Sequence, residues 1–475
     1  MSKGFFRRNY HRIILTGIIA ALFINKLPAL FLPHFWDDAW PYATGVHIMY
    51  EHGLSLMPGA VPFDVSRGHP LLFHFLFAGW MKLVGTSLFG MHFFSFLISV
   101  ALLMAVYFFC RRFFNREVAA WACVLLVVQP VFAAQTGLVL PEMLLALFGV
   151  LSLFFYLQRK NILYIIFATC MMLTKESGAV LVAALLLYEL TNSFTFINKK
   201  VSKREKIVQL AVILLPMIFF SLFFISQKIK TGYFFLPLYK SEENFHLSTI
   251  LTKLHDYSAY FFVYQGKNIV SATILVSLLW MWVKKISISD EQRKIVLLFS
   301  ELIILFLIFS SCNFYSPRYL LFILPLYIML TSFLLTQTFS ILKIAKVILW
   351  GTILVVSLTY CFRKYPVNDH TPSYVDAVIV NREAVNYLEE KNLFESKIGT
   401  DFLMSNYLTN RFCGYLSRNK TFTKVVSIKS GDAEFYVYCS FDNQNDFADY
   451  EKRLKLNLLK RFEKNYSWTE IYSVQ

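Results

Sequence analysis

Charged side chains are scarce in this chain of 475 residues, and the shortage excludes several classes of protein. Asp, Glu, Lys and Arg make up 16% of the sequence, against roughly a quarter in typical soluble proteins. So little charge beside 57% hydrophobic residues excludes intrinsic disorder. Seven cysteines are too few for a disulfide scaffold. No GxxxxGK[ST], HExxH, CxxC or GxSxG motif occurs, which disfavours an ATP-driven pump, a zincin and a serine hydrolase.

Aromatic and apolar residues take the place of charge and indicate an integral membrane protein. The chain has 49 Phe, 26 Tyr and 8 Trp, side chains that suit a bilayer and its interfaces. The net charge of +16 lies almost wholly before residue 363, where +15 accumulates, and the remaining residues carry +1. Anionic lipids and membrane topology explain that excess, and no nucleic-acid-binding motif accompanies it.

Apolar runs predict a polytopic, all-α bundle of about eleven transmembrane helices in residues 1–362. Each run approaches the 17 to 25 residues that cross the hydrocarbon core. The first run follows basic residues, but no small-residue cleavage site follows it, so we expect an uncleaved helix. The predicted spans are 13–32, 91–110, 117–134, 142–157, 161–173, 177–192, 207–226, 268–283, 295–312, 318–335 and 343–362.

Lys and Arg placement decides the topology, because inner loops carry the excess of basic residues. The segment 70–90 is apolar but interrupted by His74, Lys82 and Gly85. If this segment lies in the interface, 20 basic residues face the inside and nine face the outside. If the segment 70–90 crosses the membrane instead, every later loop changes side, and the basic cluster 199–206 lies outside. We therefore predict an interfacial helix at 70–90, a long first outer loop (33–90), a cytoplasmic N-terminus and a C-terminus on the outer side.

Residues 363–475 change composition sharply and predict a small soluble α/β domain. Two of the seven cysteines, Cys413 and Cys439, lie in it and can pair only in an oxidising compartment, a pairing that the sequence leaves open. Helical periodicity and β-rich runs alternate along this part of the chain. We expect helices at 377–393 and near 444–464, and strands at 423–428, 434–440 and 471–474.

The predicted topology places most of the polar residues at helix ends on the outer face. A cluster of acids and bases contributed by several helix ends is what a site for a membrane-bound substrate needs. The candidates are Asp37, Asp38, Asp64, Arg67, His69, Glu142, Lys175, Glu176 and Arg318.

Asp37 and Asp38 are the candidate catalytic acids, because a carboxylate near a lipid-linked electrophile can deprotonate an acceptor hydroxyl. Adjacent carboxylates seldom point the same way, so one is expected to react and the other to orient it. The alternative is a pair of solvated loop acids beside an aromatic belt. His69 can likewise be an ordinary loop histidine.

Four further residues have both a structural and a functional interpretation. Glu142 follows Pro141, so it can merely complement the positive end of a helix. Lys175 and Glu176 can be a solvated turn, or Lys175 can neutralise a lipid phosphate while Glu176 fixes it. Arg318 follows Pro317 at a helix start, where a cation is unfavourable unless an anion binds it.

Several short motifs, in order and on one side of the membrane, resemble the GT-C superfamily of polytopic glycosyltransferases. The chain is similar to the bacterial branch that joins dolichyl-phosphate-mannose protein mannosyltransferases and lipid A aminoarabinose transferases. Most members have Asp-Glu where this chain has Asp37-Asp38, and many have Lys or a second Pro in the stretch Arg67 to Pro70. The matching motifs are WDDAWPY (36–42), RGHPLLFHFL (67–76), LVLPEM (138–143), LTKES (173–177) and SPRYLLFILP (316–325).

The resemblance implies an inverting transferase that moves a sugar from a polyprenyl-phosphate donor to an acceptor hydroxyl at the outer face of a bacterial inner membrane. It implies that Asp37 is the base, with Asp38 supporting it. Arg318 with Tyr319, Lys175, Arg67 and His69 would meet the donor phosphate, and Glu142, Glu176 and Asp64 would hold the acceptor or order the site.

No cofactor is expected, although Asp37, Asp38 and Glu142 could offer oxygen ligands to a divalent metal. The acceptor can be a protein, a glycan or a lipid. Two alternatives from other classes stay open: a transporter or flippase of a lipid-linked glycan, and a receptor-like scaffold.

Overall fold

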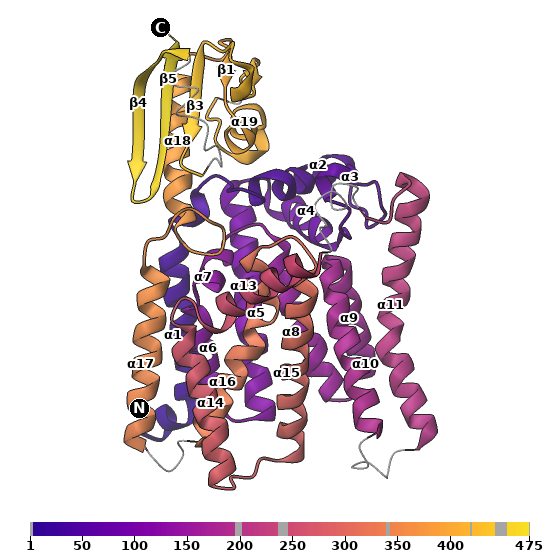
Figure 1. Ribbon diagram of the computed structural model, residues 1–475. Coiled ribbons are helices and arrows are strands. Elements are labelled where there is room, and N and C mark those ends of the chain that lie inside the picture. Colours follow the sequence, from indigo (N-terminus) through magenta and orange to yellow (C-terminus); the bar gives the residue numbers. More distant parts are fainter. Residues whose placement is uncertain are drawn as a thin grey trace.

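Long apolar runs fold into a helical bundle, and a small sheet stands at one end of it (Figure 1). The computed structural model describes residues 3–194, 202–235, 246–338, 343–418, 420–441 and 454–474. One continuous apolar core extends from the bundle into the C-terminal unit. Phe35 of the first loop shows this continuity, because its ring lies 5.7 Å from that of Tyr374 and 6.1 Å from that of Phe441.

Each of the eleven predicted spans coincides with a helix or with a helix and a short neighbour. The third span is broken into α6 and α7, because Pro130 begins a new helix. The helices are α1 (Lys3–Lys26), α5 (Leu88–Phe113), α6 (Arg116–Val127), α7 (Pro130–Gln135), α8 (Pro141–Leu157), α9 (Asn161–Thr174), α10 (Ala179–Phe194), α11 (Lys203–Thr231), α14 (Lys267–Val283), α15 (Asp290–Ser311), α16 (Leu324–Thr338) and α17 (Lys343–Phe362).

The number of membrane crossings is a separate question from the number of helices. Within the described ranges, four helices (α5, α11, α15 and α17) are each long and apolar enough to cross a membrane. A fifth span results if α13 (Leu247–Phe262) and α14, which meet at 82°, count as one. The chain is thus a multi-pass membrane protein, and the count of eleven crossings stays a prediction. Lys199 and Lys200 of the predicted inner loop lie outside the described residues.

Polar residues at the helix starts explain where several helices begin. The Ser87 and Asn115 side chains accept hydrogen bonds from the Gly90 and Val118 amides at the starts of α5 and α6. Capping boxes begin α11 at Ser202 and α15 at Ser289. These caps satisfy amides that the first helical turn leaves without partners.

The first outer loop forms a layer of short helices over one end of the bundle (Figure 1). At 13 residues α4 is about 20 Å long, too short for a hydrocarbon core of about 30 Å. That length agrees with the interfacial helix expected at 70–90. The elements are η1 (Ala29–Phe31), η2 (Asp38–Ala43), α2 (Thr44–His52), α3 (Phe63–Ser66) and α4 (Leu72–Val84).

The segment between the predicted spans 207–226 and 268–283 contains a helix that the sequence pattern does not predict. Residues Leu247–Phe262 form α13, and residues 236–245 lie outside the described part of the chain. Tyr257 and Phe261 of α13 are buried against the bundle. Tertiary packing of this amphipathic face, rather than a long apolar run, stabilises the helix.

The C-terminal unit is the expected α/β fold, with α18 (Tyr374–Glu390) packed against a five-stranded sheet (Figure 1). The strand order is β2-β1-β3-β5-β4; β1 pairs in parallel with β2 and β3, and β3, β5 and β4 run antiparallel. The remaining elements are β1 (Ile398–Gly399), α19 (Phe402–Thr409), η5 (Arg411–Cys413), β2 (Val425–Val426), η6 (Ile428–Ser430), β3 (Phe435–Cys439), β4 (Leu456–Lys464) and β5 (Ser467–Val474).

One helix of this unit is predicted wrongly. The stretch expected to be helical near 444–464 ends in strand β4, while residues 442–453 lie outside the described residues. Pairing with β5 overrides the local helical pattern, and the Arg461–Glu470 ion pair at 2.6 Å joins the two strands. Cys413 and Cys439 are both buried, and within the described residues no disulfide joins them.

Gly149 on α8 tests the packing that places Arg318. A methyl group at Gly149 would lie 2.6 Å from a ring carbon of buried Phe322, which ends the short helix η4 (Pro317–Phe322). Gly149→Ala should therefore lower the free energy of unfolding by about 1–3 kcal/mol in a thermal-shift measurement in detergent. Gly351→Ala is the control, because Gly351 on α17 has nothing within 4 Å of the added atom. A stabilised Gly149→Ala would contradict the packing.

Candidate active site

Arg318 is the centre of an ion-pair cluster that joins the first loop to the helical bundle. Pro317 begins η4, and the Arg318 side chain that follows is only 5% exposed. Its guanidinium forms ion pairs with Asp37 and Asp369. Its Nε lies 3.5 Å from Oε1 of Glu142. Three carboxylates thus supply the negative charge that Arg318 is expected to need at the start of a helix.

Lys175 is the second buried cation of the cluster. Its extended backbone separates α9 from η3 (Glu176–Gly178), which explains the charged break in an apolar stretch. The Nζ atom donates a hydrogen bond to Glu142 at 2.9 Å and lies 3.9 Å from the centre of the Tyr319 ring. Glu142 therefore connects the two cations.

Asp37 and Asp38 diverge, as expected for adjacent acids. Asp37 faces the cluster, with its side chain 19% exposed and one carboxylate oxygen 3.9 Å from Arg67. Asp38 is fully buried and accepts a hydrogen bond from His34 at 2.8 Å. Only Asp37 is thus positioned to meet a substrate, and the oxygen ligands considered for a metal, Asp37, Asp38 and Glu142, do not converge on one point.

Arg67 and His69 bring the first loop to the same site. Arg67 has a positive φ of 55° at the end of α3 and places its guanidinium 5.4 Å from the Trp40 ring centre. His69 Nδ1 lies 2.7 Å from Glu176. Burial alone would raise the pKa of Glu176, but His69 and Lys175 outweigh burial and lower it to about 2. Glu176 is therefore an anion that holds His69.

A pocket of about 360 Å³ opens beside these side chains. Its polar end is formed by Arg67, His69, Glu142, Lys175 and Glu176, and Tyr319 adds an aromatic wall. The rest is mainly apolar, with aromatic side chains from α11, α15 and the segments that follow them. These apolar lining residues include Phe220, Phe235, Phe306, Phe309 and Phe314.

Asp64 is the one predicted site residue that the structure leaves apart. It lies exposed on α3, and among the described residues it forms no ion pair. A role in holding an acceptor stays a prediction.

Asp369 is a site residue that sequence reasoning missed. It follows α17, in the stretch assigned to the soluble domain, and its partner Arg318 is 51 residues away. Its backbone carbonyl also accepts a hydrogen bond from Gln135 at 2.7 Å. Burial would raise the pKa of Asp369, but Arg318 and His370 lower it to about 2. Only the charged character of the segment NDH at 368–370 hinted at a site.

The arrangement suits a phosphate attached to a lipid. Arg67, Lys175 and Arg318 pair with the carboxylates of Asp37, Glu142 and Asp369, so an arriving phosphate can pair with a cation by displacing a carboxylate, which then loses that partner. The adjoining aromatic pocket can take a hydrocarbon chain. Fold and site together define a multi-pass membrane protein with a charged cluster at the head of an apolar pocket.

Known proteins share this fold. The family described as dolichyl-phosphate-mannose-protein mannosyltransferase matches residues 68–225. ArnT from Cupriavidus metallidurans, in its crystal structure bound to undecaprenyl phosphate, aligns with a TM-score of 0.59 and 12% identity over 98% of each chain. Archaeal oligosaccharyltransferase AglB from Archaeoglobus fulgidus, in complex with an inhibitory peptide and a dolichol-phosphate, gives 0.52 and 10% identity over 94% of this chain and 71% of AglB.

No curated protein sequence matches the chain significantly. At such low identities the structural likeness concerns the fold. The chain has the fold of the GT-C glycosyltransferase superfamily, which confirms the resemblance seen in its sequence motifs.

The low pKa of Asp369 predicts a specific pH dependence of stability. A carboxyl with a depressed pKa stabilises the fold above the ordinary value of 3.8, and this contribution, about 2 kcal/mol, is lost as the pH falls towards 2. Asp369→Asn should therefore unfold at a lower temperature than wild type at pH 7, and the two should converge below pH 4.

Thermal unfolding monitored by intrinsic fluorescence measures this difference between the two proteins. Asp432→Asn is the control, because Asp432 is an exposed carboxylate paired with Lys397. A difference between wild type and Asp369→Asn that is independent of pH would contradict the Asp369–Arg318 pairing.

Proposed function

We propose that this protein is an inverting glycosyltransferase that moves a sugar from a polyprenyl-phosphate donor to an acceptor hydroxyl. The observation that carries the proposal is the position of Asp37, which pairs with Arg318 and lies 3.9 Å from Arg67, a residue at the polar end of an apolar pocket. A base, a phosphate-binding cation and a lipid-sized pocket thus lie together. The solved structures of the same fold, with undecaprenyl phosphate in ArnT and a dolichol-phosphate in AglB, support it.

The donor would bind with its phosphate at the cations and its chain in the pocket. Arg318 suits a phosphate because its planar fork of donors can make two parallel hydrogen bonds. Lys175 adds a point charge, and the Tyr319 ring beneath its Nζ limits its movement. The polyprenyl chain would contact the aromatic side chains of α11 and α15, such as Phe220 and Phe306.

Donor binding would also free the base. In the structure one oxygen of Asp37 is engaged by Arg318. A donor phosphate at Arg318 would take over that contact and leave the Asp37 carboxylate available to an acceptor hydroxyl. Asp37 then accepts the hydroxyl proton, the hydroxyl oxygen bonds to the anomeric carbon, and the bond from that carbon to the phosphate oxygen breaks. The lipid phosphate leaves with its electron pair, stabilised by Lys175 and Arg318.

The other predicted residues would act by positioning. Glu142 holds both cations, and Glu176 holds His69 at the pocket wall. Arg67 lies near enough to Asp37 to add a contact to the phosphate. With the topology predicted from basic residues, this site would face the periplasm at a bacterial inner membrane, with the N-terminus cytoplasmic and the C-terminal unit periplasmic.

Replacing the base tests the proposal directly. Asp37→Asn keeps a hydrogen-bond acceptor for Arg318 but cannot take a proton, so transfer of radiolabelled sugar from undecaprenyl-phosphate donors into a membrane extract should fall by about 10²- to 10⁴-fold. Binding of the donor lipid should persist. The matched control is Glu51→Gln, a carboxylate-to-amide change on α2 whose partner Arg411 is exposed. Unchanged transfer by Asp37→Asn would refute the assignment, and movement of intact donor across vesicles would favour a flippase.

Removing the Lys175 charge should weaken donor binding and also slow departure of the lipid phosphate. A charged hydrogen bond contributes about 1.5–3 kcal/mol, so Lys175→Gln is expected to raise the KM for the donor about 10- to 100-fold. Lys82→Gln is the matched control, because Lys82 also lies over a tyrosine ring, 4.1 Å from Tyr50, but outside the pocket. Equal effects of both substitutions on the donor KM would contradict a phosphate contact at Lys175.

A further inference from the structure

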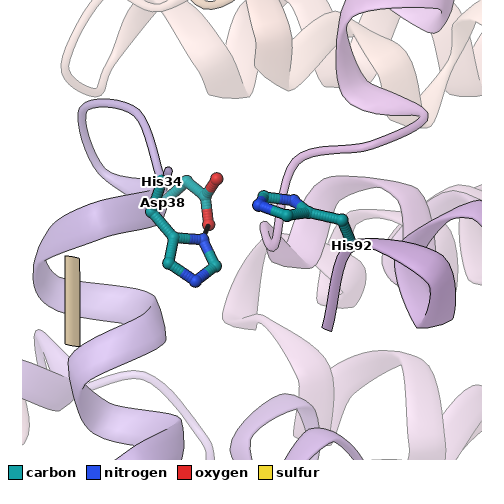
Figure 2. Close-up of side chains that lie close together, drawn as sticks. All are labelled: His34, Asp38 and His92. Carbon is teal, nitrogen blue, oxygen red and sulfur yellow. Dashed lines mark hydrogen bonds and ion pairs between the residues drawn. The ribbon is translucent and has the colours of Figure 1, made fainter. Parts of the chain in front are cut away.

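A second group of polar side chains lies behind Asp37, buried from the pocket. His34, Asp38 and His92 are 0%, 0% and 3% exposed, and the side chains point towards one another (Figure 2). One ligand atom from each lies within 4.8 Å of the other two. The three residues come from the first outer loop and from α5, and none of them lines the pocket of the proposed active site.

Asp38 lacks the partner that a buried carboxylate requires. Its contacts are the His34 ring at 2.8 Å and the Phe35 amide at 3.5 Å, and among the described residues no Lys or Arg forms an ion pair with it. Burial of a carboxylate without a positive charge costs several kcal/mol. A divalent cation beside Asp38 would offset this cost.

The two histidines show the same shortage. His92 Nδ1 lies 2.5 Å from the Gly137 carbonyl oxygen, and its Nε2 lies 3.1 Å from that of Leu32. A neutral imidazole has an N–H group on only one of its two nitrogens. The other nitrogen of His92 therefore points its lone pair at a carbonyl oxygen and forms no hydrogen bond with it. His34 Nε2 is buried and has no hydrogen-bond partner in the described part of the chain.

From this cluster we infer a divalent metal site formed by His34, Asp38 and His92, with the Leu32 carbonyl as a fourth ligand. The ion supplies the missing positive charge, and the Gly137 carbonyl holds the His92 ring in orientation as an outer partner. Two imidazoles with two oxygens favour zinc over calcium or magnesium, which prefer oxygen alone. Tetrahedral bonds of about 2.0–2.2 Å hold ligand atoms about 3.3–3.6 Å apart. The His34–Asp38 pair at 2.8 Å and the His92–Leu32 pair at 3.1 Å would therefore separate slightly when the ion binds.

The ion has a structural role in this site. The ion joins the start of the first outer loop, which contains Asp37, to α5. In the same loop the His34 amide donates a hydrogen bond to the Cys413 carbonyl of the C-terminal unit at 3.0 Å. Asp37 is the next residue in the chain to a ligand, so the metal fixes the backbone that aims the proposed base. The site itself does not depend on the proposed function.

Metal content tests this inference without reference to activity. The full chain is purified through a tag that binds no metal, and elemental mass spectrometry should find about one zinc ion per chain. His92→Gln and Asp38→Asn should both lose it. His74→Gln is the matched control and should keep the ion, because His74 is a buried histidine with no hydrogen-bond partner at either nitrogen among the described residues, outside the cluster.

The same preparations give a second readout that needs no variant. Removal of the ion with a chelator should lower the Tm of wild type, and added zinc should restore it. Wild-type protein that is folded and free of metal, with a Tm that does not respond to zinc, overturns the inference. Zinc retained at full stoichiometry in folded His92→Gln or Asp38→Asn also overturns it.

Discussion

The buried guanidinium of Arg318 is the group on which the charged cluster of this protein depends. A charge taken out of water costs several kcal/mol, and only close ion pairs with good geometry offset that cost. Arg318 obtains three carboxylates, from Asp37, Glu142 and Asp369. These acids come from the first outer loop, the start of α8 and the segment after α17. Three distant parts of the chain therefore have to meet at one side chain.

This requirement also explains why the site is polar where the surrounding protein is apolar. The balanced cluster tolerates burial because each cation has an anionic neighbour, yet the neighbours are exchangeable for a phosphate of equal charge. An apolar pocket next to the exchangeable cations favours a phosphate that carries a hydrocarbon chain. The proposed chemistry follows from this exchange, because the carboxylate displaced from Arg318 is the one proposed to accept the proton.

The sequence predicts the parts of the site that lie at the ends of apolar runs. Asp37, Glu142, Lys175 and Arg318 each interrupt or flank such a run, and the structure brings all four together. Asp369 could not be predicted in this way, because it follows the last run and meets Arg318 only through tertiary structure. The prediction that these four residues lie on one side of the membrane rests on the number of basic residues in each loop. The prediction of their roles rests on the resemblance of their motifs, in order, to a known family.

The same distinction between local and tertiary signals explains the errors in secondary structure. Long apolar runs identify the bundle helices because hydrocarbon thickness sets their length. α13 is short and amphipathic, so its helix depends on packing against the bundle that no local pattern reveals. β4 has a helix-compatible sequence and becomes a strand because β5 pairs with it. The His34–Asp38–His92 cluster joins residues 58 positions apart and was equally hidden.

A structure of the protein with undecaprenyl phosphate bound, determined by electron cryo-microscopy in lipid nanodiscs, tests the central claim most directly. The account predicts the phosphate in contact with Lys175 and Arg318, the lipid chain along Phe306 and Phe220, and the ion pair between Arg318 and Asp37 opened. A phosphate bound elsewhere, or bound here with the Arg318–Asp37 pair intact, would contradict it.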